Sequence, residues 1–167
     1  MAIYKIVLEM KKLLGNLDRC LDKAVAHAAA KKFEVDTLMH ARLAPDMLPL
    51  SFQIQTACDQ TKFVAARASG KDVPSNPDTE KTIAELKTRI HTAIAFLDTF
   101  KASDFDGADA RKISLPRWEG KSMSATDYVI EHAMPNFFFH VTTAYDLLRH
   151  NGVEIGKRDF LGQLSFS

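Results

Sequence analysis

The sequence lacks the features of secreted, membrane-spanning and nucleic-acid-binding proteins. Its two cysteines, Cys20 and Cys58, have no CxxC spacing, so we expect neither a disulfide framework nor a zinc knuckle. The longest unbroken apolar run, Ala93–Leu97, is far shorter than the roughly 20 residues of a transmembrane helix. The charges nearly cancel, with 22 Lys+Arg against 21 Asp+Glu, which argues against a broad polyanion-binding surface but leaves a local patch open.

Several common catalytic and cofactor-binding motifs are also missing. The chain has no HExxH pair, no EF-hand loop, no GxGxxG or Walker phosphate loop and no GxSxG nucleophile turn. Both cysteines fall beside apolar stripes, which favours buried, unreactive thiols. Near the N-terminus, Glu9, Lys11 and Lys12 interrupt any apolar core of a signal peptide. We therefore expect a cytoplasmic protein that binds neither membrane nor nucleic acid.

What the sequence does contain is helical periodicity over the length of one domain. Its 167 residues, 46% hydrophobic and 26% charged, fit a single domain over 1–167. Apolar side chains recur every three or four residues in four segments, which predicts amphipathic helices that pack into an all-α bundle. The predicted helices cover residues 3–28, about 48–68, 78 or 79 to 97, and 124–150.

Prolines and turn formers predict how these helices are connected. Pro45 and Pro49 make residues 31–49 an irregular connection, and three breakers make 71–77 a loop. The two long connections, 31–48 and 98–123, leave room for helices that run parallel to each other. Pro135 lies inside the last predicted helix, where we expect a kink rather than a break.

Two shorter features complete the predicted fold. Ile113, Leu115 and the turn at 118–121 indicate a short β-hairpin before the last helix. The segment 153–167 retains enough apolar surface to predict a C-terminal tail packed on the bundle. Its large apolar residues are Phe160, Leu161, Leu164 and Phe166.

A candidate site can be assembled from polar residues beside the apolar stripes, because bundles build sites between facing helices. Asn136 and His140 are four residues apart and share a face of the last helix, with aromatic neighbours. Asp59, on the second helix, could reach His140 and orient it as a general base. A histidine beside a core stripe is more often a satisfied structural residue, and Asp59 could equally form a solvated ion pair with Lys62.

Five stretches of the chain carry combinations of residues that are specific when taken together. They read ARLAPDMLPL at 41–50, QIQTACDQTK at 53–62, PNFFFH at 135–140, AYDLLRHNG at 144–152 and KRDFLG at 157–162. Through them the whole chain resembles an uncharacterised bacterial family of the DinB-like (DinB/YfiT-like) superfamily. The resemblance implies an up-down-down-up four-helix bundle with a long crossover, often assembled as a homodimer.

The resemblance also implies a position for a site. Many DinB-like proteins hold a divalent metal with one histidine on the second helix and an HxxxH pair on the fourth. Aligned on Leu148 and Gly152, that pair falls at Asn136 and His140, and the remaining ligand falls near Asp59. One histidine of three is retained. Such a set could bind a divalent metal such as zinc or nickel, although we expect none bound stoichiometrically, or hold a polar ligand without metal.

Two functional hypotheses follow. In the first, the bundle binds a small molecule or divalent metal in a central pocket near His140 and acts as a hydrolase- or transferase-type enzyme. In the second, it is a non-catalytic homodimer with a degenerate metal site, in which His140 and Asp59 form a buried pair that fixes the register of the helices. The positions of His140, Asp59 and Asn136 in the fold bear on both.

Overall fold

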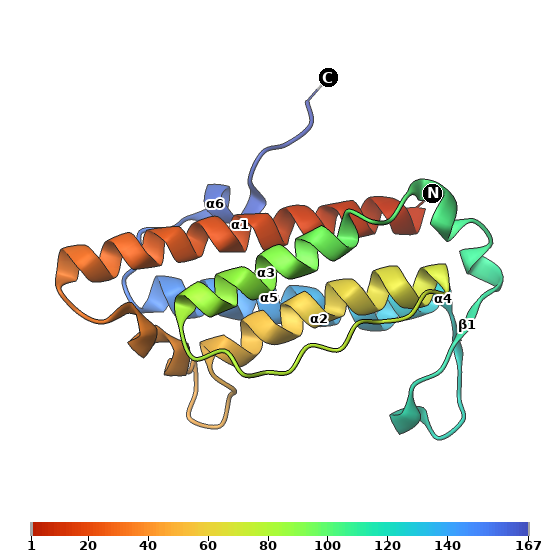
Figure 1. The fold of residues 1–167 in the computed structure, drawn as a ribbon, viewed down its shortest axis with the longest axis horizontal. Coiled ribbons are helices and arrows are strands. Elements are labelled where there is room, and N and C mark those ends of the chain that lie inside the picture. Colours follow the sequence, from red (N-terminus) through yellow and green to blue (C-terminus); the bar gives the residue numbers. More distant parts are fainter. Residues whose placement is uncertain (1, 167) are drawn as a thin grey trace.

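Four long helices carry the fold in a computed structural model that describes residues 2–166 (Figure 1). The predicted all-α architecture is confirmed. The long helices are α1 at Ala2–Lys31, α2 at Leu50–Ser69, α3 at Ile83–Leu97 and α5 at Met134–His150. Two short helical turns lead directly into α5, namely α4 at Ala125–Asp127 and a π-helical turn at Tyr128–Ala133.

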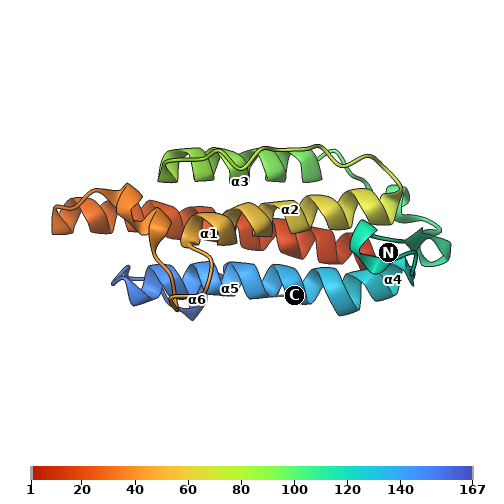
Figure 2. The ribbon, with the colours of Figure 1, turned by 90° about the horizontal axis from the view of Figure 1, so that it is seen from below.

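The helices follow the up-down-down-up order that the resemblance implies. In Figure 1, α1 and α5 run from right to left, whereas α2 and α3 run from left to right. Figure 2 shows α3 and α5 on opposite sides of the layer formed by α1 and α2. Helix α2 therefore packs against α3 on one flank and against α5 on the other.

The long crossover lies between α2 and α3, in residues 70–82, which we call the strap. Because α2 and α3 are parallel, the chain must return along about 30 Å of helix before α3 can begin, and an extended segment of this length can do so. Helix α3 was predicted to start at Asp78 or Thr79, but it begins at Ile83. Thr82 and Glu85 form a capping box there, which sets the start of the helix.

Inner stripes of the four helices form one continuous core. The positions picked out by the three-to-four-residue spacing include Leu14, Leu21, Ile54, Ile90 and Phe137, all of which are completely buried. Each such side chain contributes roughly 1.5–3 kcal/mol through removal of apolar surface from water. The spacing in the sequence thus predicted the core as well as the helices.

The connections are mostly irregular, as predicted. Between α1 and α2 lies a single 3-10 helix at Val35–His40. The expected hairpin before the last helix is confirmed, with Lys112 paired to Ser124 and Ile113 paired to Met123 in antiparallel strands. These strands are β1, Lys112–Ile113, and β2, Met123–Ser124. The hairpin loop carries a short 3-10 turn, Pro116–Trp118.

Helix α5 is locally distorted ahead of Pro135, where a kink was predicted. The π-helical turn Tyr128–Ala133 ends just before the proline, which occupies the first turn of α5. Proline lacks a backbone N–H and is tolerated in a first turn, so the change of helical pitch accommodates it without ending the helix.

The C-terminal segment packs on the bundle as far as its short helix. Val153 and Ile155 are buried, and α6, Lys157–Leu161, lies against α1. Beyond α6, Leu164 and Phe166 are exposed, Phe166 to 88%, so the predicted packing stops at the helix. No helix in the described part of the chain is both long and apolar enough to cross a membrane.

Candidate functional site

Helix α2 bears polar side chains on both flanks, and the sequence-predicted site residues lie on different ones. Gln53 contacts His140 of α5, and Arg67 contacts Tyr128 in the π-helical turn. Asp59 instead contacts Arg89 of α3. Residues 2–166 therefore contain no hydrogen bond between Asp59 and His140.

His140 is held by a glutamine that the sequence analysis did not select. Its Nδ1 lies 2.7 Å from Oε1 of Gln53, and Nε2 of the same amide donates to the backbone carbonyl of Leu48 at 2.8 Å. The second bond fixes which end of the amide faces the imidazole. His140 Nδ1 must then carry the proton and donate it, which leaves Nε2 as an unprotonated acceptor.

The surroundings of His140 keep the imidazole neutral. The ring is half-buried, and this burial lowers the pKa of His140 below its ordinary value of 6.5. Phe52 and Phe139 lie edge-on to it, with ring centroids 6.0 and 5.2 Å away. The result is one oriented basic nitrogen between aromatic walls.

Asn136 lies one helical turn before His140, as predicted, and is also half-buried. No hydrogen bond ties its side chain to another residue within 2–166, so the carboxamide is available beside the imidazole. These two residues of the predicted set thus share one face of α5, and Asp59 lies on the other flank of α2.

Asp59 belongs to a network of charges between α2, α3 and the strap. Its Oδ1 lies 2.8 Å from Nζ of Lys62 and 2.9 Å from Nη2 of Arg89. The Lys62 and Arg89 side chains are each only 3% exposed. Buried cations require compensation, and Asp59 supplies it to both.

The same cations hold the strap against the bundle. Arg89 bonds to Asp78, to Glu80 and to the carbonyl of Pro77, at 2.9, 3.0 and 3.1 Å. Lys62 donates to Asn76 at 2.5 Å. The sequence left open a solvated ion pair between Lys62 and Asp59. In the structure this pair is part of a network of ion pairs and hydrogen bonds that fixes the strap to the bundle, and we call this network the latch. An open hollow of about 350 Å³ lies beside it, lined in part by Arg89 and Glu80.

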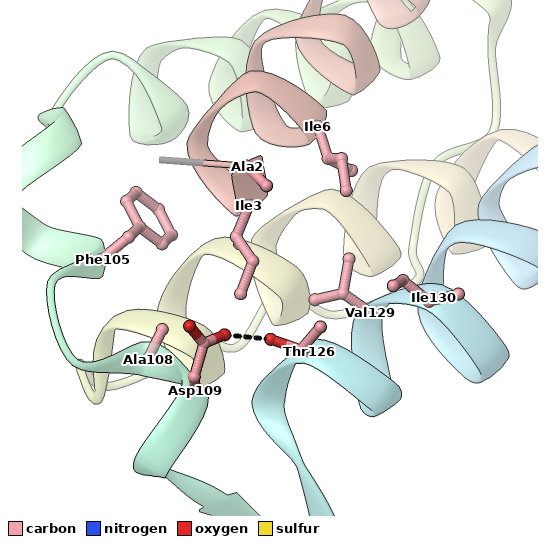
Figure 3. Close-up of a pocket in the computed structure, with 9 residues that line it drawn as sticks. All are labelled: Ala2, Ile3, Ile6, Phe105, Ala108, Asp109, Thr126, Val129 and Ile130. Atoms are coloured by element: carbon pink, nitrogen blue, oxygen red, sulfur yellow. Dashed lines mark hydrogen bonds between the residues drawn. The ribbon is translucent and has the colours of Figure 1, made fainter.

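A smaller cavity of about 110 Å³ lies between the N-terminus of α1 and the π-helical turn (Figure 3). Figure 3 shows its walls to be mostly apolar, from residues such as Ile3, Phe105 and Val129, with a single hydrogen bond between Thr126 and Asp109. It is smaller than the roughly 300–1,000 Å³ of typical ligand pockets. The cavity lies away from His140 and brings no set of reactive groups together.

The donors near His140 do not amount to a full set of protein metal ligands. Nowhere within residues 2–166 do three or more His, Cys, Asp or Glu side chains gather in an arrangement that could hold a metal ion. A zinc site normally takes three or four such ligands from the protein. Any metal at His140 would need Asn136, water or a bound molecule to complete its coordination.

The two cysteines are buried, as predicted. Burial raises the pKa of the Cys20 thiol to about 11 and that of the Cys58 thiol to about 12. Both thiols are therefore protonated at neutral pH, which disfavours them as nucleophiles.

Sequence reasoning missed the two residues that hold the predicted ones directly, namely Gln53 and Arg89. A signal for Arg89 was present, because it lies three residues after Leu86 and beside Ile90 on the edge of an apolar stripe. A charge at such a position is buried only if it has partners, and those partners lie in the strap. Glutamine carries no comparable signal, since it is common on exposed helix faces.

Two comparisons with known proteins place the chain in a family. A family model described as "Domain of unknown function (DUF1993)" matches residues 3–161. The chain belongs to the DUF1993 family. Among solved structures, this DUF1993 chain is similar to the crystal structure of a DinB family member from Shewanella denitrificans. The two are 44% identical, with a TM-score of 0.96 over 99% of this chain and 95% of that one.

The match confirms the resemblance to the DinB family that the sequence segments carried. The DUF1993 chain is thus a DinB-family four-helix bundle throughout the described residues. No curated protein matches it. Its function must therefore be argued from the geometry.

Proposed function

We propose that this DUF1993 protein binds a small polar molecule at His140, with Nε2 of the imidazole as the acceptor for a hydrogen-bond donor on the ligand. The observation that carries the proposal is the bond from His140 to Gln53, which fixes the proton on Nδ1 and leaves Nε2 unprotonated. Asn136 supplies a second polar group one turn away. Phe52 and Phe139 supply apolar walls.

The charge network on the other flank of α2 supports a binding role more than acid–base catalysis by the predicted pair. A general base needs a partner that stabilises its protonated form, and Gln53 is neutral. Asp59, which the sequence suggested for that task, compensates Lys62 and Arg89 instead. An imidazole with a lowered pKa and a neutral partner is suited to accept a hydrogen bond.

A divalent metal is the second candidate ligand, because the imidazole and the Asn136 carboxamide lie on one face of α5. Zinc and nickel both accept imidazole nitrogen, whereas a carboxamide oxygen is a weak ligand for either. With two donors from the protein, such a metal would be held loosely and exchange with solvent.

A thermal-shift panel separates these candidates. Amines, amides and alcohols, together with Zn²⁺ and Ni²⁺, are added to the wild type, to His140→Gln and to His150→Gln, a matched control at an exposed position of α5. We expect one donor-bearing class to raise the melting temperature of the wild type and of His150→Gln but not of His140→Gln. At a hundred times the dissociation constant the rise would be about 5–10 °C.

The outcomes discriminate clearly. A shift with Ni²⁺ or Zn²⁺ alone, lost in His140→Gln and in Asn136→Ala, would replace the organic ligand by a metal. Equal shifts in the wild type and His140→Gln for every compound would contradict the proposal, as would failure of diethyl pyrocarbonate to modify His140 in the folded protein.

We also propose that the protein forms a homodimer through an apolar edge that continues from the π-helical turn into α5 and points away from His140. Ile130, Met134 and Phe138 are spaced four residues apart, and Ile130 is 50% exposed. Such a stripe on a helix is typical of helix–helix contacts. Sedimentation analysis should give a dimer for the wild type and a monomer for Phe138→Glu. The exposed control Leu164→Glu should remain dimeric, and a monomeric wild type would contradict the proposal.

A further inference from the structure

The single tryptophan of the chain lies in an aromatic cluster formed by the hairpin loop and the π-helical turn, which a hydrogen bond from Arg67 ties to α2. Trp118, in the hairpin loop, is edge-on to Tyr128 and His132, with ring centroids 6.2 and 5.7 Å away. Tyr128 and His132 stack on each other at 5.5 Å with an interplanar angle of 17°. This cluster lies two helical turns from His140 and shares no residue with the site proposed there.

Two arginines from different elements converge on this cluster. Arg67 of α2 donates from Nη1 to the hydroxyl of Tyr128 at 2.7 Å, and its guanidinium lies 4.2 Å from the centroid of the Phe63 ring. Arg117 of the hairpin loop contacts Nε2 of His132. Each of the two positive charges therefore contacts one member of the same pair of stacked rings, and both act electrostatically on each ring.

Neither arginine has an acidic partner. Within residues 2–166, no carboxylate oxygen lies within ion-pair distance of Arg67 or Arg117. The contrast with Arg89, which has three carboxylate partners, is marked. Two uncompensated guanidinium groups beside a low-dielectric aromatic surface attract anions.

His132 is held in its neutral form, so the positive charge of the cluster comes from the two arginines. Burial lowers the pKa of His132, and so do the charges of Arg117 and Arg67. Arg117 donates to Nε2, so the proton of the neutral ring lies on Nδ1, which is buried without a partner among the described residues. An anion that draws Arg117 away would free Nε2 and let the ring hold its proton on either nitrogen.

We propose that Arg67 and Arg117 form a binding site for the phosphate group of a small phosphate monoester. A guanidinium fork matches the spacing of phosphate oxygens, and two unpaired forks match the charge of a dianion. Trp118, which is half-buried, offers an aromatic face on which the rest of the molecule can lie, and the fully buried Tyr128 supports it from behind. The site is local, which agrees with a chain whose net charge is only +1.

The position of the only tryptophan makes the test direct, because its fluorescence reports on this site alone. Inorganic phosphate, glycerol phosphate and phenyl phosphate are titrated at constant ionic strength, with acetate and benzoate as carboxylate probes. We expect a saturable change in Trp118 emission with the phosphates. Binding should weaken about tenfold or more in Arg117→Gln, which removes one charge-assisted contact from an exposed loop.

Two further variants serve as controls. Arg158→Gln removes the same charge from an exposed position of α6 and should bind phosphate like the wild type. Arg67→Lys keeps a positive charge but not the fork, so it should weaken binding while circular dichroism confirms the fold. Unchanged emission with every phosphate, or equal affinity in the wild type and Arg117→Gln, would overturn the proposal. Tighter binding of benzoate than of phenyl phosphate would overturn the choice of phosphate.

Discussion

The two flanks of α2 carry similar residue types but use them differently. On the flank that faces α3, Lys62 and Arg89 are buried and their charges are matched by Asp59, Asp78 and Glu80. On the flank that faces α5, polar atoms are left over. They include Nε2 of His140, the carboxamide of Asn136, the buried Oε1 of Gln60 and two arginines without acidic partners.

This difference indicates which flank is structural and which can bind a ligand. The charges of the network beside α3 are matched within the protein, although Nε of Arg89 is buried without a hydrogen-bond partner among the described residues. Several of its partners lie in the strap that joins two parallel helices. A buried polar group that lacks a partner costs free energy, so a protein retains one most readily where a ligand can satisfy it. We therefore expect the α3 flank to contribute mainly to stability, and the binding proposed at His140 to involve the α5 flank.

The largest loss of stability should follow from removing the central residue of the charge network between α2, α3 and the strap. Arg89→Met leaves the partly buried Glu80 without its cation, leaves Asp59 with Lys62 alone, and releases the strap. We expect a loss of about 3–5 kcal/mol in the free energy of unfolding, measured by urea denaturation. If Arg89→Met unfolds at the same urea concentration as the wild type, the latch has no structural role.

A smaller effect is expected on the other flank from Gln53→Met. This change deprives His140 Nδ1 and the Leu48 carbonyl of their partner, which should cost about 1–3 kcal/mol. The proton of His140 would then be free to move to Nε2. If Gln53→Met has the same free energy of unfolding as the wild type and its His140 still carries the proton on Nδ1, then Gln53 does not orient the ring.

The fold was more predictable from the sequence than the site. The spacing of residues such as Leu14 and Ile54 reports burial directly, so the helices and core followed from it. The start of α3 was misplaced because the acidic residues at 78–80 resemble a helix N-terminus. They lie in the strap, where Arg89 of the following helix binds them, and such a side-chain contact leaves no periodic signal.

The same reason separates Asp59 from His140. Both residue types suit a catalytic pair, and both helices were predicted correctly, but the rotation of α2 decides which neighbour each side chain meets. Asp59 is six residues from Gln53, so the two point to different flanks of α2. The neutral Gln53, rather than a carboxylate, faces the imidazole.

The charge network on the α3 flank should also make the stability of the fold depend on pH. Burial alone would raise the pKa of Glu80, but hydrogen bonds from Gln55 and Arg89 outweigh it and hold the pKa below the ordinary 4.5. Because the pKa of Glu80 is lowered in the folded state, its ionised carboxylate stabilises the fold above pH 4.5. This stabilisation is lost as the pH falls through the pKa of the folded state. The stability gap between the wild type and Glu80→Gln should therefore shrink below pH 4.5. A gap independent of pH would contradict this origin.

The smallest effect is expected at the exposed edge of the latch. Asp78 also binds Arg89, but its side chain is 53% exposed, so solvent screens the pair. Asp78→Asn should cost less than about 1 kcal/mol in urea denaturation. A loss as large as that in Arg89→Met would mean that the strap depends on this one contact rather than on the network.

The most direct test of the account is the protonation state of His140. Long-range ¹H–¹⁵N correlation spectra recorded across a pH titration distinguish the two imidazole nitrogens. We expect the neutral ring at pH 7 to carry its proton on Nδ1, with Nε2 unprotonated and a pKa below 6.5. A proton on Nε2, or a pKa above the ordinary value, would contradict the claim that His140 presents an open acceptor to a ligand.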